Sequence, residues 1–306
     1  MFRRTLAIVA LSALAVTAAA PTASAHPAAK APVTIDLPAG FQPEGIAIGS
    51  APFAYFGSRA DGDIYRANLR TGRGHVISQG PGTASLGLKI DARGRLFVAG
   101  GPAGDARVID TDTGGVLKSY PLQTGTAFIN DVTLTGGAAW FTDSANPFVS
   151  KLPFGHHGAL PAAATKVPLT GDIAYQTGNN ANGITPTPDG RGLIIVQSNT
   201  GKLFRTSFSG VTHEIDLAGE SVLNGDGLWL RGRTLYVVQN RDNVITKIAL
   251  NRSATRGTVL SRTTDPRFDV PTTIAEFGHR FYLPNARFTT TPTPATPYTA
   301  NAVPRP

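Results

Sequence analysis

The chain contains 306 residues, which is the length of one large domain or two small ones. Hydrophobic residues make up 41%, enough for a substantial buried core. The absence of cysteine excludes disulfide bonds, a thiol nucleophile and cysteine-ligated zinc or iron–sulfur centres. The 34 glycines and 23 prolines favour tight turns between short strands over long helices, so the composition predicts an all-β protein.

Residues 1–25 have the features of a secretory signal peptide. Arg3 and Arg4 precede an apolar run from Leu6 to Ala20, and Ala23-Ser24-Ala25 forms a small-residue cleavage site. The run is short for a membrane-spanning helix, and no basic stop-transfer flank follows it. We therefore expect residues 26–306 to be an exported domain that has no membrane span.

Removal of Arg3 and Arg4 lowers the formal net charge from +8 to +6. The remaining basic residues are spread thinly, with no run of five like charges and no alternation of aromatic and basic residues. A nucleic-acid partner is therefore not expected. We expect a monomer that binds a small molecule.

A short unit recurs six times along the chain and predicts the fold. Each unit has a polar residue, then Gly or Asp, a first strand, a turn and a second strand rich in aromatic residues. Successive units begin 42, 44, 52, 44 and 46 residues apart. Four strands per unit, six times over, predict a six-bladed β-propeller, with a β-sandwich as the alternative. The first strands begin at Glu44-Gly45-Ile46, Leu86-Gly87-Leu88, Asn130-Asp131-Val132, Asn182-Gly183-Ile184, Asp226-Gly227-Leu228 and Thr272-Thr273-Ile274.

The sixth unit has no further strand directly after Leu283, which suggests that both chain ends complete one blade. Val33–Leu37 would supply its outer strand and Pro297–Val303 its third strand, with Thr289–Thr296 as the linking loop. The alternative is a disordered proline-rich tail.

The long third unit contains a segment, Phe154–Thr177, that we interpret as an inserted loop. Its adjacent His156 and His157 would point to opposite sides of an extended chain, so a solvated loop is favoured over a metal site.

The first residues of the six units form a column that would converge at the mouth of the central channel. Four of the six carry carboxylate or amide side chains, which strands normally disfavour. Clustered buried acids require a cation, and hard oxygen ligands suit Ca²⁺ better than zinc or copper. The alternative is that these residues only shape turns. The column consists of Glu44, Leu86, Asn130, Asn182, Asp226 and Thr272.

The sequence resembles the SMP-30/gluconolactonase/LRE-like calcium-dependent propellers, to which the paraoxonases are related. The resemblance lies in Pro43-Glu44-Gly45-Ile46, Ile129-Asn130-Asp131-Val132, Ala181-Asn182-Gly183-Ile184 with Pro188-Asp189-Gly190, and Asn224-Gly225-Asp226-Gly227-Leu228. It implies one Ca²⁺ at the channel mouth and hydrolysis of a lactone or related ester.

The resemblance also implies roles for particular residues. It makes Glu44, Asn182 and Asp226 metal ligands and Asn130 a ligand or a substrate contact. Asp226 would be the general base, with Asp131 in reserve.

Two departures from the family concern the substrate. Paraoxonase-like members carry a catalytic His where this chain has Leu86, and sugar lactonases carry an Arg where it has Phe128. These residues would make the channel mouth more apolar. We expect Leu86, Phe128 and Thr272 to contact the substrate.

Two other functions stay open. A secreted propeller could bind a small molecule or a cell-wall component without turnover, as the missing His and Arg suggest. A strictosidine synthase-like propeller would use a late-blade acid, for which Glu276 is the candidate. A serine hydrolase is not supported, because no nucleophile elbow lies between a strand and a helix.

Overall fold

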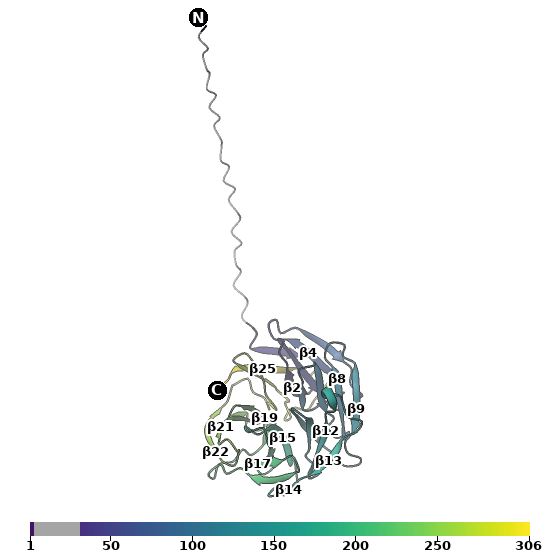
Figure 1. Cartoon of the computed structure of the whole chain (residues 1–306), viewed down its shortest axis with the longest axis vertical. Coiled ribbons are helices and arrows are strands. Elements are labelled where there is room, and N and C mark those ends of the chain that lie inside the picture. The colour runs from purple at the N-terminus through teal and green to yellow at the C-terminus, as the bar shows by residue number, and fades with distance from the viewer. Residues whose placement is uncertain (3–30) are drawn as a thin grey trace. The chain divides into compact units, whose positions relative to one another are not determined.

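Six β-sheets surround a common axis in the computed structural model, which describes residues 1–2 and 31–306 (Figure 1). The predicted six-bladed β-propeller is therefore confirmed. Residues 31–306 form one compact unit. Most of the predicted signal peptide falls in residues 3–30, outside the described residues.

The first three blades each consist of four antiparallel strands, ordered from the axis outward along the chain. Blade 1 contains β2 (Pro43–Ile48), β3 (Phe53–Ser58), β4 (Ile64–Asn68) and β5 (Gly74–Ser78). Blade 2 contains β6 (Leu88–Ile90), β7 (Arg95–Ala99), β8 (Asp105–Asp110) and β9 (Val116–Pro121). Blade 3 contains β10 (Ile129–Thr135), β11 (Ala138–Asp143), β12 (Phe148–Pro153) and β13 (Thr165–Pro168).

The last three blades differ in their outer strands. Blade 4 contains β15 (Ala181–Pro186), β16 (Gly192–Gln197), β17 (Lys202–Ser207), β18 (Val211–Glu214) and, parallel to β18 at its edge, β14 (Thr170–Gly171). Blade 5 contains β19 (Gly225–Arg231), β20 (Thr234–Gln239), β21 (Val244–Leu250) and β22 (Gly257–Thr263). Blade 6 contains β23 (Ala275–Phe277), β24 (Arg280–Pro284), β25 (Tyr298–Pro304) and β1 (Thr34–Leu37).

The second strand of a blade is buried on both faces, which explains its continuous apolar sequence. Every residue of β16 is buried. Ile194 and Val196 pack toward blade 5, whereas Leu193 and Ile195 pack toward blade 3. Because successive side chains of a strand point to opposite faces, a strand between two neighbouring blades has no polar face.

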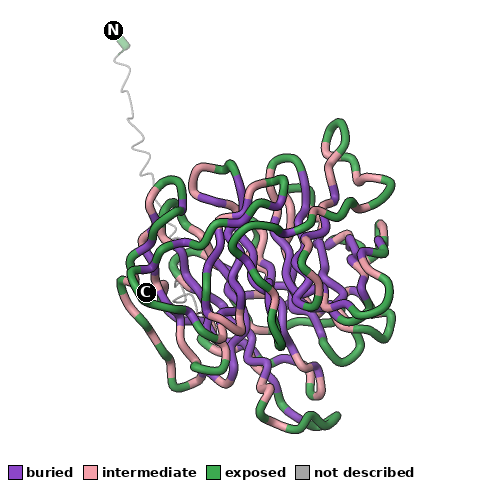
Figure 2. Tube along the Cα trace, turned by 90° about the horizontal axis from the view of Figure 1, so that it is seen from below, coloured by how far each residue is buried: buried purple, intermediate pink, exposed green. Residues whose placement is uncertain are grey.

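The hydrophobic core is divided among the interfaces between blades. Six clusters of buried side chains each join two successive blades, and one of them joins blade 6 to blade 1. Figure 2 shows the buried residues inside the molecule and the exposed ones along the turns. Each blade is therefore held by its two neighbours, and stability requires a closed ring.

The two ends of the described unit close this ring in blade 6, as predicted. β1 pairs with β25 antiparallel, from Thr34 opposite Asn301 to Leu37 opposite Tyr298. The backbone N–H of Ala302 also donates to the carbonyl of Val33 at 2.8 Å. The alternative of a disordered C-terminal tail is wrong.

The segment Phe154–Thr177 is only partly the loop we expected. It contains β13, the fourth strand of blade 3, and β14, which extends blade 4. His156 and His157 lie exposed in η1 (His156–Gly158), the single helical turn of the described residues. No helix in this part of the chain is both long and apolar enough to cross a membrane.

Candidate functional site

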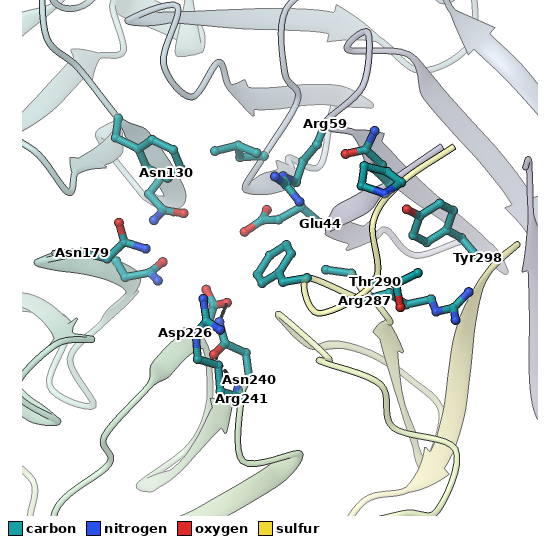
Figure 3. A pocket seen from close by; sticks show the side chains of 17 residues that line it. Glu44, Arg59, Asn130, Asn179, Asp226, Asn240, Arg241, Arg287, Thr290 and Tyr298 are labelled. Atoms are coloured by element: carbon teal, nitrogen blue, oxygen red, sulfur yellow. Dashed lines mark hydrogen bonds between the residues drawn. The ribbon is translucent and has the colours of Figure 1, made fainter. Parts of the chain in front are cut away.

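The column residues that carry side-chain oxygens converge on one cavity of about 310 Å³ at the channel mouth. In Figure 3, Glu44, Asn130 and Asp226 point toward a common centre from three different blades. Asn182 also lines this cavity. All four residues are buried, with exposed fractions of 3–7%. The structure thus brings together the four predicted metal ligands.

A β-bulge aims each of these four side chains at the axis. In β2, β10, β15 and β19 the pairing with the next strand skips two residues, and the first skipped residue is Glu44, Asn130, Asn182 or Asp226. A bulge interrupts the alternation of a strand and redirects a side chain. The inner strands of blades 2 and 6 carry no such bulge among the described residues.

The residue after the column residue lies where two inner strands come close together. A Cβ atom on Gly45 would lie 2.0 Å from the carbonyl oxygen of Leu86, and one on Gly183 would lie 2.0 Å from that of Asp226. Only glycine fits at such a distance. The Gly of the repeated motif therefore lets neighbouring blades approach at the channel mouth.

Two serines orient the asparagine amides. Ser144 Oγ donates to the carbonyl of Ala181 at 2.7 Å, and Ser198 Oγ donates to the carbonyl of Gly225. Because the single proton of each hydroxyl is used in this bond, the hydroxyl oxygen can only accept a hydrogen bond from the neighbouring asparagine amide. Asn130 Nδ2 and Asn182 Nδ2 donate to these hydroxyls, both at 2.9 Å. This arrangement identifies which end of each amide is the oxygen.

The side-chain oxygen of Asn182 is left without a partner by this arrangement. Asn182 Oδ1 is buried and accepts no hydrogen bond from any described residue. A buried, unsatisfied carbonyl oxygen is costly and is rare in folded proteins. It is the kind of atom that a bound cation would satisfy.

Asp226 is a buried acid with an altered proton affinity. Burial raises its pKa to about 7, although hydrogen bonds from Asn240 and Asn182 oppose this rise. The Asn240 amide donates to Asp226 Oδ2 at 2.7 Å.

The pKa of Glu44 is raised well above its ordinary value. The cause is first burial, then the negative charges of Asp226 and Asp131, while Arg59 and Lys89 act in the opposite direction. Two acids that resist ionisation at one site indicate missing positive charge, which a divalent cation would supply.

The predicted substrate contacts are only partly brought together. Leu86 and Phe128 line the cavity and form its apolar wall. Thr272 does not, because its side chain is fully buried and its Oγ1 donates to the carbonyl of Glu44 at 2.5 Å. Thr272 therefore joins blade 6 to blade 1, and the structure does not bring it to the cavity.

Asp131, the reserve base, also does not line the cavity. Its Oδ1 accepts from the backbone N–H of Val132 at 2.8 Å, and its Oδ2 accepts from that of Ile184 at 3.2 Å. Both carboxylate oxygens are thus directed at backbone groups of blades 3 and 4. The structure places Asp131 in the joint between blades and away from the cavity.

Sequence reasoning missed the residues that support the column. In blades 3, 4 and 5 the residue just before the bulge pairs with the last residue of the second strand. The residues that directly follow that second strand are Ser144, Ser198 and Asn240. Arg59 has the same position in blade 1, and it also lines the cavity. The signal in the sequence is a polar residue immediately after the second strand of blades 1, 3, 4 and 5, and it can be recognised only once the strand register is known.

The donor set fits calcium by the nature of its atoms. Two carboxylates and two amide oxygens are hard ligands, and such a set leaves coordination positions for water or substrate. Within residues 31–306 no group of three or more His, Asp or Glu side chains is arranged to hold a metal. A cation at this site would thus depend on the amide oxygens as much as on the acids.

Fold and site together define a six-bladed β-propeller with an oxygen-lined cavity at one end of its channel. No protein-family model matches the chain, and no curated protein matches its sequence. Solved propellers are nevertheless similar to it in structure. They include Mala s 1, the major allergen of Malassezia sympodialis, with a TM-score of 0.67 and 14% identity over 89% of this chain and 96% of that one.

Two similar structures are enzymes. A streptogramin B lyase has a TM-score of 0.61 and 17% identity, over 82% of this chain and 79% of its own. A gluconolactonase from Xanthomonas campestris has a TM-score of 0.59 and 16% identity, over 87% of both chains. At these identities the likeness supports the propeller fold, and a single activity does not follow from it.

Proposed function

We propose that the protein is an exported, calcium-dependent hydrolase of a lactone or a related ester, of the SMP-30/gluconolactonase type. The observation that carries this proposal is the set of four oxygen-bearing side chains, Glu44, Asn130, Asn182 and Asp226, on one cavity. Asn182 Oδ1 adds to it, since no residue in the described part of the chain donates a hydrogen bond to this buried oxygen. The likeness to a gluconolactonase gives further support.

When bound, Ca²⁺ would polarise the scissile carbonyl and offset the negative charge that develops on its oxygen. Ser144 and Ser198 fix the amide oxygens toward the cavity, so little reorganisation is required on binding. We assign the general-base role to Asp226. Asn240 orients the Asp226 carboxylate through Oδ2. The raised pKa of this carboxyl group, about 7, suits it to take a proton from the attacking water.

The apolar wall formed by Leu86 and Phe128 points to a substrate that presents an apolar face to this side of the cavity, unlike the hydroxyl-rich ring of a sugar lactone. The same two residues favour the second candidate, a secreted propeller that binds a ligand without turnover. A strictosidine synthase-like role has less support, because Glu276 does not line the cavity. Its carboxylate instead pairs with Arg231 at 2.7 Å and accepts from Trp229 Nε1 at 3.0 Å.

Calcium titration by calorimetry tests the proposal, with a panel of lactones assayed on the same samples. We expect binding in the native protein and a loss of at least about a hundredfold in affinity for Asp226→Asn, because one of two charged ligands is removed. Asp242→Asn is the matched control, since Asp242 is exposed and does not line the cavity.

The outcomes separate the candidates. Calcium-dependent hydrolysis that is lost in Asp226→Asn and kept in Asp242→Asn would support the hydrolase. Calcium binding without turnover of any lactone would favour the binding protein. An absence of calcium binding in the native protein would refute the metal site.

A further inference from the structure

Three arginines line the cavity together with the acids: Arg59, Arg241 and Arg287. Arg287 is committed within the fold, because its Nε pairs with Asp269 at 2.8 Å and its guanidinium donates to the carbonyl of Pro297. Arg59 and Arg241 form no ion pair with any acid of residues 31–306. Both are exposed at the cavity. Within residues 31–306, these two positive charges therefore face the cavity without a direct ion-pair contact, although the charge of Arg59 lowers the pKa of Glu44.

The guanidinium of Arg59 lies against an aromatic ring and donates no hydrogen bond to any residue that the structure describes. Its central carbon lies 4.7 Å from the centre of the Phe288 ring, and Phe288 also lines the cavity. An aromatic face supports the plane of a guanidinium and leaves its N–H groups free for a bidentate contact. In Figure 3 the Arg59 side chain extends toward Glu44 at the cavity. A planar anion could be bound at this edge.

The position of Arg59 in the repeat also supports an anion-binding role for this residue. In blades 3, 4 and 5 the equivalent residues, Ser144, Ser198 and Asn240, hydrogen-bond the column residue of their own blade. Arg59 makes no such bond to Glu44 among the described residues, nor does it lie within ion-pair distance of it. Arg59 therefore does not orient the column residue of its blade as the equivalent residues do, and its guanidinium can contact a ligand.

The charges of the cavity indicate what that ligand would be. A divalent cation would balance the two carboxylates, Glu44 and Asp226, and the two arginines would remain uncompensated. We propose that the substrate carries a carboxylate in addition to its scissile ester bond, and that Arg59 binds this carboxylate, with the positive charge of Arg241 on the same cavity adding to the attraction. This inference rests on the proposed function, whose substrate class it narrows. Arg–carboxylate pairs give directional recognition as well as attraction.

The first test compares two probes of nearly the same shape, γ-carboxy-γ-butyrolactone and the corresponding carboxamide. We expect the native protein to prefer the carboxylate by about tenfold or more in kcat/KM, mainly through KM. Arg59→Gln should bring the ratio between the two probes close to one, and Arg59→Lys should keep part of the preference. Arg252→Gln, an exposed arginine of blade 5 away from the cavity, should leave the ratio unchanged.

The second test does not depend on turnover. Calorimetry would compare binding of cyclopentanecarboxylate and cyclopentanecarboxamide, which contain no lactone, with and without Ca²⁺. With Ca²⁺ we expect the carboxylate to bind more tightly than the amide and Arg59→Gln to abolish the difference. Without Ca²⁺ the difference should be smaller, because the charge of Glu44 then offsets that of Arg59. Carboxylate binding that requires Arg59, without hydrolysis of any lactone, would uphold the anion site and refute the hydrolase.

Two results would overturn the inference. One is hydrolysis of lactones with no preference for the carboxylate probe, which would leave the hydrolase intact. The other is an Arg59→Gln variant that changes calcium affinity but keeps the discrimination between probes. In that case Arg59 would serve only as a counter-ion to Glu44.

Discussion

Asn182 shows how a single hydroxyl can set the chemistry of a metal ligand. Ser198 accepts from the Asn182 amide and donates to the carbonyl of Gly225, so it fixes both the amide and the start of blade 5. Ser198→Ala should weaken calcium binding by about tenfold to a hundredfold, the usual effect of losing a group that orients a ligand. Titration calorimetry would measure this loss.

Ser150→Ala is the matched control for this prediction. Ser150 is a buried serine of β12 whose Oγ has no hydrogen-bond partner among the described residues. Its removal should leave calcium affinity unchanged. If Ser198→Ala bound calcium as tightly as the native protein, the orientation of the amide would not matter for the site.

The sequence predicts the column residues because Glu44, Asn130, Asn182 and Asp226 are polar at a position where strands are normally apolar. It could not separate these from Thr272 and Asp131, since the direction of a side chain at a bulge depends on strand register. Thr272 is the column residue of blade 6, whose inner strand has no bulge among the described residues. Asp131 is the second of the two residues that the strand pairing skips at the bulge of blade 3. Both are therefore turned toward neighbouring strands.

At the scale of elements, closure of the ring depends on β1. Ile35 in β1 is fully buried between blade 6 and blade 1, together with Phe56 and Tyr298. Ile35→Ala should lower the free energy of unfolding by about 2–5 kcal/mol, because it leaves a cavity in the interface that closes the ring. Denaturation with urea would measure the change.

Val33 provides the comparison on the same segment. Its side chain is 51% exposed, so Val33→Ala should change the free energy of unfolding by no more than about 0.5 kcal/mol. If Ile35→Ala lowered the free energy of unfolding as little as Val33→Ala does, the burial of β1 would add little to closure of the ring.

Repetition explains why the strands were predictable and the connections were not. Inner and second strands recur with the same apolar pattern, whereas β13 and β14 are short and exposed and have no such pattern. The segment that follows β24 is a further example. It carries Arg287, Phe288 and Thr290 to the cavity. The predicted linking loop begins only at Thr289, and the sequence indicated no role for any of the three residues.

For the whole molecule, the buried acids determine how stability depends on pH when calcium is absent. Burial raises the pKa values of Glu44, Asp226 and Asp131, so the folded chain holds protons that the unfolded chain releases. Stability from this source is complete below the ordinary pKa of a carboxyl group, near pH 4, and is lost as the pH rises toward about 7. The calcium-free protein should therefore become less stable between about pH 5 and pH 8.

Other acids do not obscure this trend. A hydrogen bond from Arg267 lowers the pKa of Asp265, and one from Thr187 lowers that of Asp189. Stability from lowered pKa values is present above the ordinary carboxyl range and is lost only in more acidic solution. Between about pH 5 and pH 8 these acids are ionised in both states, and their contribution is constant.

Thermal unfolding in a chelator, followed across this pH range, would measure the effect. We expect the unfolding temperature of the native protein to fall by several degrees as the pH rises, and saturating Ca²⁺ to remove most of the fall, because it binds the ionised acids. Asp226→Asn should flatten the calcium-free profile and raise the unfolding temperature at about pH 8, since it removes a buried charge without changing the shape of the side chain. A calcium-free profile that is flat or rises with pH would contradict the raised pKa values. A fall that calcium does not reverse would separate the buried acids from metal binding, and the channel mouth would then be an acidic cluster stabilised by protons alone.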